Sequence, residues 1–324
     1  MSMTTRTPRL PSGLPRRWDG ETYHGKPVTR ASSFDWKVST YIVILGIAGG
    51  AQVIAAVARG TGDEAGLARR ARFLALAGSI VGPLVLVQHL KTPARWFNML
   101  RIVRPTSPMS VGSWLLTVFG GLSAITALGE LLGRRWPFAR RVADAAQLPA
   151  AAAGAGMGVY TAGLLAATST PLWAAAPAAL AAKFGSAAMA GAASVLALLQ
   201  RAGGERRSAK RLEDLAMLAG LAELVAGHEA AWHWKQKGLD RSITQGRAGL
   251  LNDVGGKLIG VLLPAAAHGV GRAVGGRAGA MLPELASLGV IIGSAAMRHA
   301  VLLAGNDSAC RPEHSFAVTQ RARP

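Results

Sequence analysis

The chain has 324 residues, of which 50% are hydrophobic and 16% are charged, and its mean hydropathy is +0.28. Soluble domains carry about 25% charged residues, so this composition favours an integral membrane protein. The single cysteine, Cys310, excludes a disulfide framework and a cysteine-ligated iron–sulfur cluster. The net charge of +19 fits basic loops at anionic lipid headgroups, and no basic and aromatic platform indicates binding to nucleic acid.

The segment 1–37 is basic and contains many prolines and glycines, which predicts an extended N-terminal arm lying on a surface. It has no apolar stretch followed by a cleavage site, so we do not expect a signal peptide. The segment 305–324 predicts a polar C-terminal tail. Between them, residues 38–304 form the apolar domain.

Eight apolar runs divide this domain. A membrane helix needs about 20 mostly apolar residues to cross a hydrocarbon core of about 30 Å. Arginine and lysine lie almost wholly between the runs, which favours membrane spans over a soluble helical protein rich in alanine and glycine. The sequence therefore predicts an all-α integral membrane bundle of eight transmembrane helices. The predicted spans are 38–58, 71–90, 110–132, 145–167, 172–200, 212–231, 250–270 and 282–304.

The ends of several spans carry further signals. Trp36 is an aromatic anchor at the start of the first span, and Gly49 and Gly50 within that span permit another helix to approach closely. His89 ends the second span, before an amphipathic ARWFNMLRIV that should lie in the membrane interface. The stretch VYTAGLLAATSTPLW, residues 159–173, predicts a tight hairpin with a polar lining between the fourth and fifth spans.

Ionisable residues inside the runs are costly in hydrocarbon, so each is a functional candidate that should face the bundle interior. We assign Glu223, Asp253 and Lys257 to a proton path. Asp253 and Lys257 are four residues apart and share a helix face, so a structural pair that neutralises itself is the alternative. The other ionisable residues in the runs include Glu130, Lys183, His228, Glu229, His268, Arg298 and His299.

Four stretches, TPARWFNMLRIVRPTSPMSVGSWLL, IAGGAQ, YTAGLLAATSTPLW and RHAVLLAG, resemble the NrfD/polysulfide reductase membrane-subunit family over about Trp36 to Gly305. The resemblance implies a chain with no haem or iron–sulfur cluster of its own that binds menaquinone or ubiquinone near one membrane face. It also implies a ferredoxin-like iron–sulfur subunit as electron partner, itself attached to a molybdopterin-type catalytic subunit. The expected location is among the lipids of the bacterial inner membrane.

Carried over to this sequence, the family's quinone pocket is lined by Trp36 and Tyr41 in the first span and by Tyr160 and Thr168 at the end of the fourth. Tyr160 is the expected donor to a quinone carbonyl, with an interfacial phenol as the alternative. Tyr41 departs from family members that have an imidazole there, and a phenol is a poorer base at neutral pH. His89 would compensate by taking up a quinol proton, unless it bonds a loop carbonyl instead.

Three other functions remain open. A haem-binding, cytochrome b-type anchor needs paired histidines at matching depth, and the candidates His89, His228, His268 and His299 lie near span ends. A secondary transporter or channel would use the same ionisable groups, although no internal repeat is visible. A structural anchor without quinone chemistry is the third. Basic loops flank both membrane faces, so the orientation stays open.

Overall fold

The computed structural model describes residues 29–61, 65–274 and 276–319, and most of these residues are helical, with no β-strand among them. This confirms the predicted all-α class. The long helices are α1 (Trp36–Gly60), α2 (Ala65–Val87), α3 (Pro108–Leu132), α4 (Pro137–Ala166), α6 (Pro177–Ala202), α7 (Arg206–Gln236) and α11 (Gly276–Cys310). A further pass consists of α9 (Gly246–Leu250), the π-helix η3 (Leu251–Leu262) and α10 (Leu263–Ala273). The short helices are η2 (Pro93–Leu100), α5 (Pro171–Ala175), α8 (Arg241–Thr244) and α12 (Pro312–Thr319).

Among the described residues, 7 helices are long and apolar enough to cross a membrane, which makes this a multi-pass membrane protein. They correspond to seven of the eight predicted spans, although α2 ends at Val87 and the predicted second span runs to residue 90. The predicted span 212–231 lies in α7, which has 31 residues but is too polar to count by composition. The predicted start of the fifth span at residue 172 also differs, because the backbone leaves the helical conformation at Ala176 and α6 begins at Pro177.

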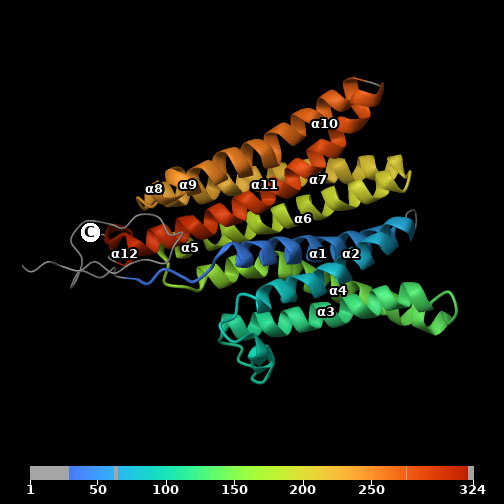
Figure 1. Cartoon of the computed structure of the whole chain (residues 1–324), viewed down its shortest axis with the longest axis horizontal. Coiled ribbons are helices and arrows are strands. Elements are labelled where there is room, and N and C mark those ends of the chain that lie inside the picture. Colours follow the sequence, from blue (N-terminus) through green and yellow to red (C-terminus); the bar gives the residue numbers. More distant parts are fainter. Residues whose placement is uncertain (1–28, 62–64, 275, 320–324) are drawn as a thin grey trace, which may run out of the picture.

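Successive long helices alternate in direction (Figure 1). The start of α1, η2, α5, α8 and α12 lie at one end of the bundle, which we call the termini end. The connections α1–α2, α3–α4, α6–α7 and α10–α11 lie at the other, the opposite end.

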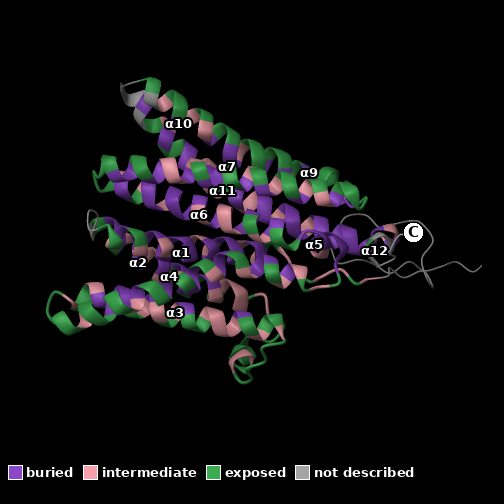
Figure 2. Cartoon of the chain, turned by 180° about the vertical axis from the view of Figure 1, so that it is seen from behind, coloured by how far each residue is buried: buried purple, intermediate pink, exposed green. Residues whose placement is uncertain are grey.

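Helix α1 is the centre of the bundle, since it packs against α2, α4, α6 and α11. Figure 2 shows buried residues concentrated along α1 and α6. A Cβ on Gly49 would lie 2.2 Å from the carbonyl oxygen of Gly154 in α4, and a Cβ on Gly50 would lie 2.9 Å from that of Ala188 in α6. Only glycine permits these two approaches, as the sequence predicted for this span.

A cluster of polar residues joins α11 to α8 and α12 at the termini end. Ser242 of α8 donates to Asp307 of α11 (2.7 Å), and Arg311 donates to the same carboxylate (2.7 Å). The ring of His314 in α12 is buried and lies 3.3 Å from the hydroxyls of Ser242 and Ser308. Residues 305–319, expected as a polar tail, are thus mostly helical and packed on the bundle. Residues 1–28 of the predicted arm and 320–324 of the predicted tail lie outside the described residues.

Replacing Gly49 by alanine is expected to destabilise the bundle by about 1–3 kcal/mol, because the added methyl group meets the backbone of α4. The measurement is thermal unfolding of the detergent-solubilised protein. Gly121→Ala in α3 is the matched control, since a Cβ there meets nothing within 4 Å. Equal stability of the two variants would contradict the close contact.

A pH effect is expected from His314. Burial and the neighbouring Arg311 lower the pKa of its imidazole from 6.5 to about 4. The unfolded chain therefore binds more protons between about pH 6.5 and pH 4, so stability is fully present above pH 6.5 and falls as the pH decreases toward 4. Melting temperatures measured across this range should fall less steeply for His314→Gln than for the wild type; parallel curves would count against the buried neutral imidazole.

Candidate functional site

The structure brings the five predicted pocket residues to the termini end. Trp36 and Tyr41 lie on the first two turns of α1, and His89 follows the end of α2. Tyr160 is on the last turns of α4, and Thr168 follows that helix. Trp36 is 62% exposed, as an interfacial anchor would be, whereas Tyr41 is only 9% exposed.

The two phenols differ in what their hydroxyl groups contact. The hydroxyl of Tyr160 donates to the carbonyl oxygen of Pro108 (2.6 Å), and its ring lies against Gly112, where a Cβ would be 2.0 Å from that hydroxyl. Tyr41 lies close enough to Tyr160 to interact electrostatically, but it forms no hydrogen bond with any residue that the structure describes. Tyr41, rather than Tyr160, therefore has the available donor.

His89 contacts a carboxylate and not a loop carbonyl. Its Nδ1 lies 3.1 Å from Oδ1 of Asp35, the N-cap residue of α1, which the sequence reasoning missed. The side chain of Thr168 forms hydrogen bonds with the backbone at the end of α4. Its hydroxyl donates to the carbonyl oxygen of Leu165 (2.7 Å) and accepts from the amide of Thr170 (3.3 Å).

A second group of buried charges lies in the middle of the bundle. Lys183 of α6, Glu223 of α7 and Arg298 of α11 are all buried, and the charge of Glu223 acts on both cations. Lys183 donates to Oδ1 of Asn252 in η3 (3.3 Å), and Arg298 donates to the carbonyl oxygen of Phe184 (3.1 Å). Each buried cation thus has a carboxylate or oxygen partner, as burial of charge requires.

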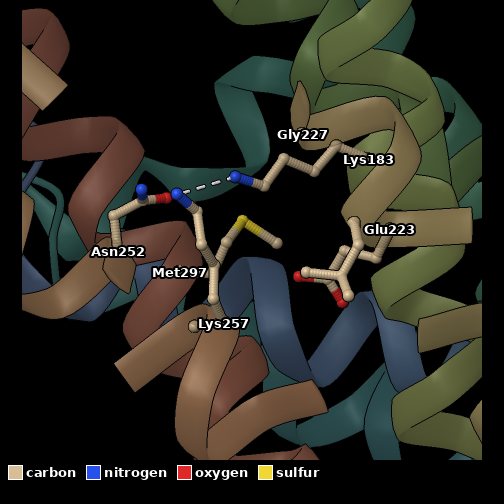
Figure 3. A pocket seen from close by; sticks show the side chains of 8 residues that line it. Lys183, Glu223, Gly227, Asn252, Lys257 and Met297 are labelled. Atoms are coloured by element: carbon tan, nitrogen blue, oxygen red, sulfur yellow. Dashed lines mark hydrogen bonds between the residues drawn. The ribbon is translucent and has the colours of Figure 1, made fainter. Parts of the chain in front are cut away.

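Lys183, Glu223 and Asn252 line a small cavity (Figure 3). Its volume of about 20 Å³ has room for about one water molecule. The lining comprises Lys183, Glu223, Leu224, Gly227, Asn252, Gly256, Lys257 and Met297. Two predicted proton-path residues, Glu223 and Lys257, therefore meet at one cavity with Lys183 and Asn252, which the sequence reasoning did not assign to it.

The third predicted proton-path residue, Asp253, pairs with Lys257 (2.7 Å), as the spacing of four residues predicted. Both side chains are half exposed, at 51% and 49%, so the pair lies at the surface of the bundle. Asp253 also accepts from the side-chain amide of Asn252 (3.0 Å). All of these η3 residues belong to a π-helix, a rare form of helix that is frequent at functional sites.

A third polar network, near the opposite end, was not predicted. Gln52 of α1 donates to Ser123 (3.1 Å) and Thr126 (3.0 Å) of α3. Its side-chain oxygen accepts from Gln147 of α4 (3.0 Å), which in turn accepts from Arg72 of α2 (2.7 Å). In the sequence, the position of Gln52 and Gln147 within apolar runs could have indicated this network.

Arg72, the second residue of the predicted span 71–90, is completely buried. Besides Gln147, it contacts the carboxylates of Glu130 (2.6 Å) and Asp144 (3.2 Å). Asp144 also pairs with Arg59 of α1. The always-charged guanidinium joins α2, α3 and α4, and Asp144 extends the network to α1, an arrangement that suits structure better than proton transfer.

The four histidines considered as haem ligands lie on different elements with different neighbours. His89 contacts Asp35, and His299 of α11 lies 3.2 Å from the hydroxyl of Ser39. His268 of α10 lies 3.8 Å from Glu213 of α7, and His228 is exposed on α7.

Comparison with known protein families identifies the family of this chain. The family described as polysulphide reductase, NrfD, matches residues 22–306. A search of curated proteins found no match. The matched range includes every residue of the termini-end site and of the mid-bundle cavity.

Replacing Arg72 by leucine is expected to cost about 3 kcal/mol of unfolding free energy, because Glu130 and Asp144 lose their buried counter-charge. Arg141→Leu is the matched control, since Arg141 is exposed on α4. Thermal unfolding in detergent compares the two. A small effect at both positions would show that the network contributes little.

Proposed function

The chain belongs to the NrfD polysulphide reductase family, the membrane subunits of respiratory oxidoreductases, and we propose that it exchanges electrons between the quinone pool and an iron–sulfur partner. The family normally pairs with iron–sulfur and catalytic subunits. The proposed partners here are a ferredoxin-like subunit docked at the termini end and a molybdopterin-type catalytic subunit. The proposed location is the bacterial inner membrane.

The observation that carries the proposal is the phenol of Tyr41. It is buried about two turns inside the termini end and forms no hydrogen bond with a described residue. A quinone headgroup presents two carbonyl oxygens that need donors, together with an apolar tail that needs an apolar slot. Tyr41 supplies one donor, and Tyr160 supplies a second if its hydroxyl leaves the Pro108 carbonyl.

The proposed bundle includes α7 as an eighth span. Its polar residues Glu213 and Glu223 are buried among other helices. Leu218, Leu221 and Val225 are 58% to 67% exposed, on the surface where lipid would lie. A span whose polar side faces the other helices has a low mean hydropathy, although its outer surface is compatible with hydrocarbon.

Glu223, Asp253 and Lys257 are proposed to exchange protons through the mid-bundle cavity. Lysine and glutamate both titrate, and the cavity has room for a water molecule that links them. A cavity of this size admits water and not a larger solute, which favours proton exchange over secondary transport. The proposal does not extend to a proton pump.

Tyr41→Phe is expected to lower kcat/KM for a quinol analogue about tenfold, because one hydrogen bond to the reacting headgroup is lost. Tyr160→Phe should lower thermal stability as well as turnover, because its hydroxyl bonds Pro108 and is also the second proposed donor to the quinone. Turnover would be measured on the complex purified from its native membrane. Full turnover of Tyr41→Phe would contradict the proposed site.

The same preparation tests the function itself through partner identification by mass spectrometry, quinone extraction and an optical spectrum. An iron–sulfur subunit and extractable quinone are expected. A haem Soret band belonging to this chain would favour a cytochrome b-type anchor. A chain that purifies without redox partners or quinone would favour transport or a structural role.

A further inference from the structure

A carboxylate and an imidazole meet at the rim of the termini end. Oδ1 of Asp35 lies 3.1 Å from Nδ1 of His89, although the two residues are 54 positions apart in the chain. The side chains are 42% and 18% exposed, so the pair lies between the bundle and water. Lys37 forms a second contact between the same segments, because its side chain donates to the carbonyl oxygen of Gln88 (3.4 Å).

Asp35 holds its position through the backbone of α1. Its Oδ1 accepts from the amides of Lys37 (3.0 Å) and Val38 (3.3 Å), so the carboxylate is the N-cap of the helix. The helix that fixes this oxygen also carries Tyr41, about 9 Å further along its axis. One rigid element therefore places both the carboxylate and the available phenol.

The contact with Asp35 fixes how the imidazole is used. Beside an ionised carboxylate a proton on Nδ1 is favoured over a lone pair, which leaves the lone pair of the neutral ring on Nε2. No described residue forms a hydrogen bond with Nε2. His89 thus presents a free base, and its orientation is set by a group that does not itself take up the proton.

The charged groups around this pair come from four elements. Lys37 lies on α1, and Lys91 follows His89 on its own connection. His299 of α11 bonds Ser39 and feels the charges of both Asp35 and Arg247 of α9. Asp35 is the one carboxylate in this set, so its removal leaves cations and imidazoles around His89.

We propose that Asp35 is the positioning residue that orients His89 to exchange quinol protons with water at the termini end. The inference rests on the proposed quinone chemistry. A quinol that is oxidised gives two electrons to the iron–sulfur subunit and two protons to the protein. His89 accepts each proton at Nε2 and releases it to water before the next, and quinone reduction runs these steps in reverse.

The variant Asp35→Asn separates this role from helix capping, because asparagine caps a helix as well as aspartate does but carries no charge, so its amide oxygen holds the Nδ1–H of His89 more weakly. The test measures oxidation of a short-chain quinol analogue by the purified complex with a dye as electron acceptor, over a range of pH. Asp35→Asn is expected to lower kcat about tenfold with little change in KM. His89→Gln is expected to lower kcat about a hundredfold, the lower limit for a general base.

Two further results distinguish positioning from a merely structural role. The double variant should be no slower than His89→Gln alone, because Asp35 acts through His89. In Asp35→Asn, the loss should fall on kcat and leave KM nearly unchanged, whereas a disordered binding site would change both quantities. Asp240→Asn, the same substitution in front of α8 at the same end, is the matched control and should leave both quantities unchanged.

Wild-type kinetics in Asp35→Asn, or effects of the two substitutions that add, would overturn the positioning role. Such a result leaves the proposed function intact, because the complex still oxidises quinol. A wild-type complex that neither binds nor oxidises quinol would overturn the proposed function instead. Thermal unfolding of each variant identifies any that fail to fold, and Asp35→Glu then serves as the conservative variant that should recover part of kcat.

Discussion

The contact of α1 with α4 and α6 through glycine is the constraint on which the rest of the bundle depends. In a membrane the helices gain little from hydrophobic burial against each other, so association relies on close packing and on hydrogen bonds between helices. Gly49 and Gly50 allow both close packing and hydrogen bonds between helices, because the backbones come near enough for neighbouring side chains to reach the next helix. The same helix holds Tyr41 toward one membrane face and Gln52 toward the other.

Charged residues form contacts with one another at three depths of the bundle. Near the opposite end, Arg72 is held by carboxylates and amides, and its permanent charge gives a fixed joint between helices. In the middle, Lys183 and Glu223 titrate and share a cavity the size of a water molecule, which suits proton exchange. At the termini end, Asp35 and His89 are in contact with water, where protons can leave or enter.

Helix α7 shows why a count of apolar runs depends on the fold. Glu213 and Glu223 lie among neighbouring helices, whereas Leu218, Leu221 and Val225 are exposed. Mean hydropathy adds the two sides together, so it cannot separate a polar helix from a span that keeps its polar residues inside. Contact with α6 along its length resolves what composition leaves open.

The sequence by itself determined the helical class, the family, the positions of the critical glycines and the end of the bundle at which the pocket residues gather. Run length, helix-breaking prolines and small-residue spacing are local properties, so they can be seen in one chain. Only the tertiary structure decided that the Tyr160 hydroxyl is taken by Pro108, that Arg72 is buried and that Asp35 faces His89. Each of these contacts depends on how a helix is rotated about its own axis relative to a segment far away in the chain, and no local pattern specifies that rotation.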